Sequence, residues 1–168
     1  MTIFVSPHLD DVALSCAARI LFMHGNGERP IIATVFSQGS EAASAHYVHR
    51  ASEEEGACKA LGADPVLAGF LDAPYRSSDY NSFEKILFAD LSRERKTVEE
   101  ATAFLVKLVQ ERSASELCAP LGLGWHIDHI ITHEASKLAA QRTGVPISYY
   151  EDRPYAFVEG STALRKAE

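Results

Sequence analysis

Short apolar runs rich in β-branched residues alternate along this 168-residue chain with segments whose apolar residues recur at helical spacing. We predict strands at 3–5, 30–37, 66–71, 116–120 and 146–151. This alternation is typical of a three-layer α/β fold, a doubly wound and mostly parallel sheet of Rossmann-like type covered by helices on both faces. No internal repeat or linker interrupts the pattern, so we expect a single domain over residues 1–168.

The helices are expected between these strands, at 11–25, 45–61, 97–112 and 126–142. Thr97 and Glu100 have the spacing of a capping box at the start of the third helix. Residues 73–80 are expected to form a loop over the edge of the sheet, either a substrate lid or a plain connection. A short helix is possible at 83–91, and the polar tail is expected to be loose.

Composition restricts the partners and the compartment. The net charge is −7 and no basic patch stands out, which argues against a nucleic acid or an anionic membrane as partner. No apolar run is long enough to cross a bilayer and the chain shows no leader segment, so we expect a cytoplasmic protein. Cys16, Cys58 and Cys118 are odd in number and lie in apolar segments. They are therefore predicted to be free core residues, not disulfides or zinc ligands.

Polar clusters follow four of the predicted strands, at Ser6–Asp11, Asp72, His126–His129 and Glu151–Asp152. Because ligands in open α/β sheets bind outside the carboxyl ends of the strands, we expect these clusters to gather at one edge. His8-Leu9-Asp10-Asp11 and His126-Ile127-Asp128-His129 each lie at a strand-to-helix junction. Either cluster alone is a weak signal, and the two together are a much stronger one.

These clusters contain the side chains that a hydrolytic zinc site needs. Such a site has about three nitrogen or oxygen ligands and an open position for water. His8, one of the adjacent aspartates and one histidine of the second cluster satisfy that count. A carboxylate outside the coordination sphere could take the proton of the water. A second histidine could stabilise the oxyanion or protonate the leaving amine.

Several polar residues also have a purely structural interpretation. In this interpretation Asp10 and Asp11 serve simply as caps of the helix that they begin. Glu54 and Glu55 are predicted to lie on a solvated, charged helix face. His133 follows His129 by four residues, a chelating spacing, but is predicted to be a surface or supporting group. His46 and His49 could reach a substrate, although nothing else singles them out.

Pro7-His8-Leu9-Asp10-Asp11 resembles the Pro-His-Pro-Asp-Asp-Glu signature of the LmbE-like, or PIG-L, family of zinc-dependent N-acetylglucosamine deacetylases. His126-Ile127-Asp128-His129 is similar to that family's His-Pro-Asp-His motif. Arg50-x-x-Glu53, followed by Ala60-Leu61-Gly62, is similar to its substrate-side helix, and Asp72 matches an acidic residue after a strand. The resemblance extends over roughly residues 3–155, and it implies an LmbE-like domain.

The resemblance implies a role for each matching residue. The zinc ligands would be His8, Asp11 and His129, with Asp10 as the general base for the metal-bound water. His126 would stabilise the oxyanion or act as an acid, and Asp128 would orient or tune a neighbouring histidine. Arg50 and Asp72 would bind sugar hydroxyls. The chain would then be a zinc-dependent hydrolase that removes an acetyl group from an N-acetylated amino sugar or its conjugate.

Three departures from the family pattern leave alternatives open. Leu9 and Ile127 replace prolines, and Val12 replaces a glutamate. The chain also stops soon after residue 155, so we expect a domain shortened at its C-terminus, whose cleft stays open or is completed in a homo-oligomer. The alternatives are an amidase for a larger sugar–thiol conjugate and a non-catalytic metal- or sugar-binding domain. Another divalent metal would also fit two histidines and an aspartate. A dinucleotide-binding module is disfavoured, because no Gly-x-Gly-x-x-Gly follows the first strand.

Overall fold

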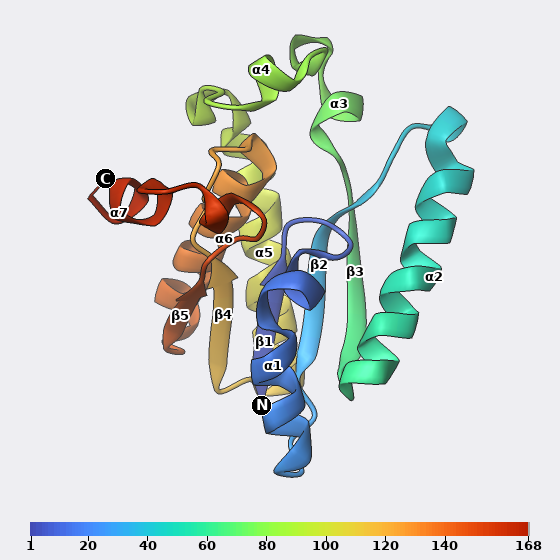
Figure 1. The fold of residues 1–168 in the computed structure, drawn as a ribbon, viewed down its shortest axis with the longest axis vertical. Helices are drawn as coiled ribbons and strands as arrows, with labels where there is room; N and C mark the ends of the chain where they lie inside the picture. The colour runs from blue at the N-terminus through green and yellow to red at the C-terminus, as the bar shows by residue number, and fades with distance from the viewer. Residues whose placement is uncertain (168) are drawn as a thin grey trace.

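A computed structural model describes residues 1–167, which fold around a five-stranded sheet (Figure 1). The strands are β1 (Thr2–Ser6), β2 (Ile31–Gln38), β3 (Asp64–Leu71), β4 (Glu116–Pro120) and β5 (Ile147–Tyr150). Their order in the sheet is β3-β2-β1-β4-β5, and all four neighbouring pairs are parallel. The three-layer α/β fold predicted from the sequence is confirmed.

Helices cover both faces of the sheet. In Figure 1, α1 (Asp11–Gly25) lies in front of the strands, and α5 (Arg95–Arg112) and α6 (Ile127–Thr143) lie behind them. The helix α2 (Ser44–Leu61) is seen to the right of β3 and packs in the same core cluster as α1. Because successive side chains of a strand point to opposite faces, β1 contributes Phe4 to the core under α1, and Ile3 and Val5 to the core under α5 and α6. All five residues of β1 are buried, so this strand lies at the centre of the molecule.

The strand order reverses beside β1. The chain moves outward through β2 and β3, then crosses to the other side of β1 to form β4 and β5. In sheets of this type, the connections after the two central strands diverge and leave a crevice for a ligand. Here those connections are residues 7–10 after β1 and residues 121–126 after β4. Both sequence motifs therefore lie at the edge of the crevice.

The segment between β3 and α5 is built from short turns of helix. These are α3 (Ala73–Arg76), η2 (Ser78–Tyr80), α4 (Phe83–Ile86) and η3 (Leu91–Glu94). The predicted capping box is wrong, because α5 begins two residues before Thr97. The Thr97 hydroxyl instead donates a hydrogen bond of 2.6 Å to the carboxylate of Glu94, which directly precedes α5.

The tail is more regular than expected. It forms η4 (Tyr155–Phe157) and α7 (Ser161–Ala167). The Arg165 side chain donates a hydrogen bond of 3.0 Å to the Leu121 carbonyl, which fastens α7 to the loop after β4. The prediction of a loose tail is therefore wrong for the residues up to 167. The one other short element is η1 (Glu41–Ala43), which leads into α2.

Glu54 is also placed differently from the prediction. Its side chain is buried, with only 4% of the residue exposed, and it accepts a hydrogen bond of 3.1 Å from the Thr34 hydroxyl on β2. Burial raises the pKa of this carboxyl group. Glu55 is exposed, as predicted. The three consecutive glutamates of α2 therefore divide between the sheet-facing side of the helix and its outer side.

Two other predictions concern the whole chain. Cys16, Cys58 and Cys118 are free and buried, which confirms their prediction as core residues. Over residues 1–167, none of the helices combines the length and the apolar character that crossing a membrane requires.

Candidate metal centre

The Asp11 carboxylate lies between two imidazoles that come from opposite parts of the sequence. Its Oδ2 atom is 3.4 Å from Nδ1 of His8 and 3.4 Å from Nε2 of His129. It also accepts a hydrogen bond of 2.9 Å from the His8 backbone N–H, which fixes the turn after β1. One potential ligand atom from each of these three residues lies within 4.8 Å of the others. The structure thus brings together the three predicted metal ligands.

This donor set suits a divalent cation. Two imidazole nitrogens and one carboxylate oxygen are the ligands of many hydrolytic zinc sites, which keep a further position open. Burial alone would raise the pKa of Asp11, but the neighbouring His129 and His8 outweigh it and hold the pKa at about 2. Asp11 is therefore ionised at neutral pH. The residues present fit a bound metal ion.

Asp152, just after β5, fixes the orientation of His129. Its Oδ1 atom is 2.6 Å from Nδ1 of His129, so Nε2 is left facing Asp11. Its Oδ2 atom accepts hydrogen bonds from the backbone N–H groups of Gly122 and Leu123, at 2.9 and 3.1 Å. The sequence places Asp152 in a polar cluster after a predicted strand, and no role was predicted for it. A carboxylate directly after a strand was the available signal.

Replacement of Asp152 by asparagine should weaken divalent-metal binding by about 10- to 100-fold, as is typical when a residue that supports a metal-ligating histidine is changed. The cause is the loss of the negative charge that holds the His129 ring in place. Titration against a chelating indicator measures the affinity. Glu151→Gln is the matched control, because Glu151 is an exposed carboxylate outside both metal-capable groups, 3.7 Å from Lys166. An unchanged affinity in Asp152→Asn would contradict this assignment.

Asp128 is a fully buried carboxylate beside His8. Its Oδ2 atom is 3.1 Å from Nε2 of His8 and accepts a hydrogen bond of 2.9 Å from the Ala73 backbone N–H. Its Oδ1 atom accepts a hydrogen bond of 2.6 Å from Arg76, whose Nε atom is 3.0 Å from Glu94. The contact with His8 is the one that the predicted orienting role of Asp128 requires. Arg76 and Glu94 were not predicted, and nothing in the sequence distinguishes them from other charged residues of the 73–94 segment.

His126 completes the group of imidazoles. Its ring centroid is 5.0 Å from that of His8 and 5.4 Å from that of His129. Burial and the neighbouring His8 lower the pKa of His126 to about 4, so the ring is neutral at pH 7. Nδ1 accepts a hydrogen bond of 3.2 Å from the Asp128 backbone N–H. The ring proton therefore lies on Nε2, and this N–H favours oxyanion stabilisation over proton donation by an imidazolium.

Asp10 belongs to neither of the metal-capable groups found among the described residues. It precedes α1 with φ 115° and ψ −29°, and 59% of its side chain is exposed. Partial burial and the neighbouring Asp11 raise its pKa. Arg50 supports this turn: it donates a hydrogen bond of 2.7 Å to the Leu9 carbonyl and lies 3.4 Å from the Asp10 carboxylate. Asp10 is thus next to the ligands and outside their set.

Asp72 lies in a second metal-capable group, with His8, His126 and Asp128. It accepts a hydrogen bond of 2.6 Å from the Tyr47 hydroxyl and lies 3.5 Å from Nε2 of His8. Both oxygens of Asp128 already accept hydrogen bonds, which makes this group the weaker candidate for a metal. The sugar-binding roles predicted for Arg50 and Asp72 stay predictions.

The remaining histidines lie outside both groups. Nδ1 of His133 is 2.9 Å from the Pro120 carbonyl oxygen, and its ring stacks on Tyr149. His46 packs on Tyr47, and His49 is an exposed residue 3.4 Å from Glu53.

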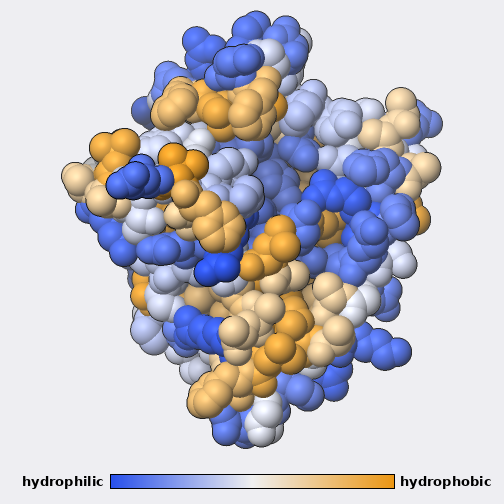
Figure 2. Space-filling view, in the orientation of Figure 1, coloured by the Kyte–Doolittle hydropathy of each residue, from blue (hydrophilic) through white to orange (hydrophobic). Residues whose placement is uncertain are grey.

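Figure 2 shows a hollow of largely hydrophilic residues below the 73–94 segment, between α2 and the C-terminal segment.

Comparison with known proteins identifies the family. The family model for PIG-L, GlcNAc-PI de-N-acetylase, matches residues 3–140, most of the chain. The chain belongs to the PIG-L family. This confirms the resemblance read from the two motifs.

A curated relative is 34% identical over 165 residues, the 2'-N-acetylparomamine deacetylase of Streptomyces fradiae. The alignment covers 92% of this PIG-L-family chain and 57% of the relative, so the chain spans little more than half of that protein's length. Two solved structures share the fold. A deacetylase of the teicoplanin biosynthesis pathway has a TM-score of 0.84 and 23% identity, covering 95% of this chain and 70% of that one. The A40926 pseudoaglycone deacetylase has a TM-score of 0.77 and 26% identity, covering 92% and 64%.

The positions where this PIG-L-family chain departs from the family signatures are all buried. Val12 belongs to the core under α1, Ile127 belongs to the core on the opposite face, and Leu9 is 2% exposed. Each therefore replaces a family residue with a side chain that packs in the interior. The departures leave the metal-capable groups unchanged.

Proposed function

We propose that this chain is the catalytic domain of a metal-dependent amidohydrolase that removes the acetyl group of an N-acetylated amino sugar or its conjugate. The observation that carries the proposal is the arrangement of the Asp11 carboxylate between His8 and His129, with Asp10 beside them and outside the set. The family and the named activity of the Streptomyces fradiae relative support the same reaction.

Zinc is the proposed cofactor, held by His8, Asp11 and His129. When bound, zinc lowers the pKa of a coordinated water molecule to about 7 and so supplies a nucleophile at neutral pH. Asp152 holds the His129 ring in its ligating orientation, and the negative charge of Asp128 beside His8 favours a cation there.

The other residues act on protons and on the substrate. Asp10 accepts the proton of the attacking water and returns it to the leaving amine. The Nε2–H group of His126 donates a hydrogen bond to the oxyanion that develops on the acetyl carbonyl. Arg50 and Asp72 bind the sugar hydroxyls. A homo-oligomer and a cytoplasmic location stay predictions.

Acetate release tests the proposal. Protein loaded with zinc should release acetate from N-acetylglucosamine conjugates, and treatment with a chelator should abolish that activity until zinc is restored. A panel of acylated amino sugars and sugar–thiol amides separates a deacetylase from an amidase for larger amides. Bound metal without turnover on any member of the panel would contradict the proposal and favour a binding domain.

A further inference from the structure

An aromatic pair lies beside the His126 segment and has no part in the chemistry described above. The rings of Phe88 and Trp125 stack with centroids 5.5 Å apart and planes inclined by 25°. Trp125 directly precedes His126, and Phe88 comes from the loop between α4 and η3. The Phe88 residue is 72% exposed, so one face of this stack is open to solvent.

Backbone contacts hold the pair against the active-site loop. Leu87 forms an antiparallel bridge with His126, and the Phe88 N–H donates a hydrogen bond of 3.1 Å to the Trp125 carbonyl. Phe88 and Trp125 both have left-handed backbones, with φ of 56° and 53°. Residues with side chains rarely adopt this conformation, so the surrounding structure must hold the backbone at both positions.

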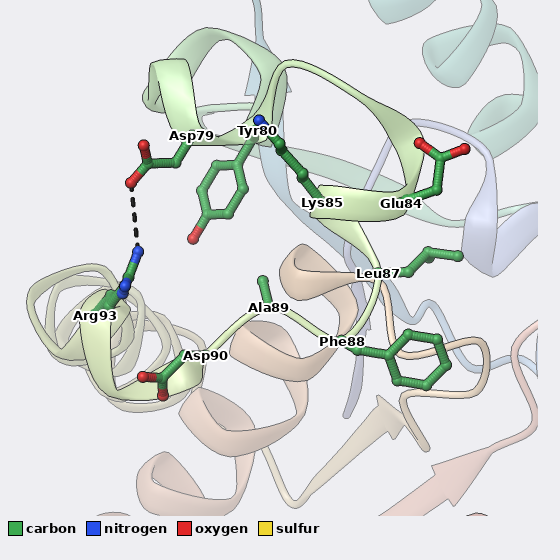
Figure 3. Close-up of a pocket in the computed structure, with 9 residues that line it drawn as sticks. All are labelled: Asp79, Tyr80, Glu84, Lys85, Leu87, Phe88, Ala89, Asp90 and Arg93. Atoms are coloured by element: carbon green, nitrogen blue, oxygen red, sulfur yellow. Dashed lines mark hydrogen bonds and ion pairs between the residues drawn. The ribbon is translucent and has the colours of Figure 1, made fainter.

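Figure 3 shows the direction in which the pair points. Leu87 and Phe88 project from one side of their segment, and Asp79 and Arg93 lie on the other side, where they pair. The segment also lines a hollow of about 370 Å³, none of whose lining residues belongs to either metal-capable group. Phe88 lines the same hollow as Asp79 and Arg93, on the side that lies away from their ion pair.

We propose that Phe88 and Trp125 form an aromatic subsite for a second ring of the substrate, a pyranose attached to the acetylated sugar. This inference rests on the proposed function, because it places the acetamido group at His126. Leu87 pairs with the backbone of His126 and Phe88 with that of Trp125, so a ring linked to a sugar at His126 is placed to reach the pair.

The chemistry of the surroundings favours a carbohydrate ring. Asp10, Arg50 and Asp72 give the site carboxylate and guanidinium groups, which suit hydroxyl and amino substituents. The exposed Phe88 face offers an apolar contact that the C–H face of such a ring can use. An occupant with an apolar face and a polar rim matches both sets of groups.

Trp125 makes the subsite directly observable, because it is the only tryptophan in the chain. Its fluorescence is recorded while zinc-loaded protein is titrated with glucosamine or with chitobiose, which have one and two rings and no acetyl group to remove. Chitobiose should change the emission and bind more tightly than glucosamine. Phe88→Ala should weaken chitobiose binding by about five- to tenfold, a typical effect of losing one aromatic contact, with glucosamine binding within about twofold of wild type.

Phe83→Ala is the matched control, because Phe83 is 60% exposed on the same segment and lies outside the stacked pair. In turnover, Phe88→Ala should raise KM for N,N'-diacetylchitobiose by the same factor and leave kcat and the KM for N-acetylglucosamine near wild type. Equal binding of one- and two-ring ligands, or equal effects of Phe83→Ala and Phe88→Ala, would overturn the subsite. If acetate is never released but chitobiose still binds through Phe88, the proposed function fails and the subsite stands.

Discussion

Replacement of Asp10 by asparagine should lower kcat for deacetylation by about 10²- to 10⁴-fold and leave the bound metal in place. The expectation follows from its position beside the three ligands and outside both metal-capable groups. Asparagine keeps the size of the side chain and tolerates the left-handed backbone at this position, so the turn should be preserved. The asparagine side chain cannot accept a proton at neutral pH, so the substitution removes only the proposed general base.

The measurement pairs initial rates of acetate release with the metal content of the same samples. Asp79→Asn is the control, because Asp79 is an exposed carboxylate whose ion-pair partner is Arg93, 3.5 Å away. We expect wild-type metal content in both variants and a reduced kcat in Asp10→Asn alone. A wild-type kcat in Asp10→Asn would remove Asp10 from the mechanism. Loss of the metal would instead make Asp10 a ligand.

Replacement of Asp11 by alanine should have the larger effect, with loss of stoichiometric metal and of measurable turnover. Asp11 is the only anionic member of the proposed ligand set, and its Oδ2 atom faces both His8 and His129. Without it, two imidazoles remain, one fewer than the three protein ligands that a catalytic zinc site uses.

Elemental analysis after gel filtration tests this expectation, with Asp79→Ala as the control. Circular dichroism shows whether the variant is folded, which matters because Asp11 also accepts the His8 backbone hydrogen bond. A folded Asp11→Ala variant that retains one metal ion per chain would contradict the proposed ligand set. Retention of metal would then point to the second group, which contains Asp72 and Asp128.

The meeting of the two motifs was predictable because it depends on topology. Alternating strands and helices imply a parallel sheet, and the polar residues after each strand must then lie at the same edge. His8 and His129 are 121 positions apart in the numbering, and they meet because β1 and β4 are neighbours in the sheet. The motif spacing alone could not give that adjacency.

Features that depend on the packing of individual side chains were not predictable. Nothing in the sequence distinguishes Glu53, Glu54 and Glu55 from one another. The rotation of α2 against β2 decides which of these side chains is buried beside Thr34. Thr97 and Glu100 match a capping-box sequence, but α5 already begins at Arg95, and the Thr97 hydroxyl donates its hydrogen bond to the Glu94 carboxylate instead. Asp152 contacts His129 because β5 pairs with β4, and the spacing of apolar residues along the sequence does not reveal that pairing.

The backbone at Asp10 has one more consequence. A φ of 115° is a conformation in which glycine is the least costly residue, and an aspartate there gives up about 1–2 kcal/mol of folding free energy. The chain has a carboxylate at a position where glycine would give a larger free energy of unfolding. The turn after the first strand is thus the place where the proposed base lowers the stability of the folded protein.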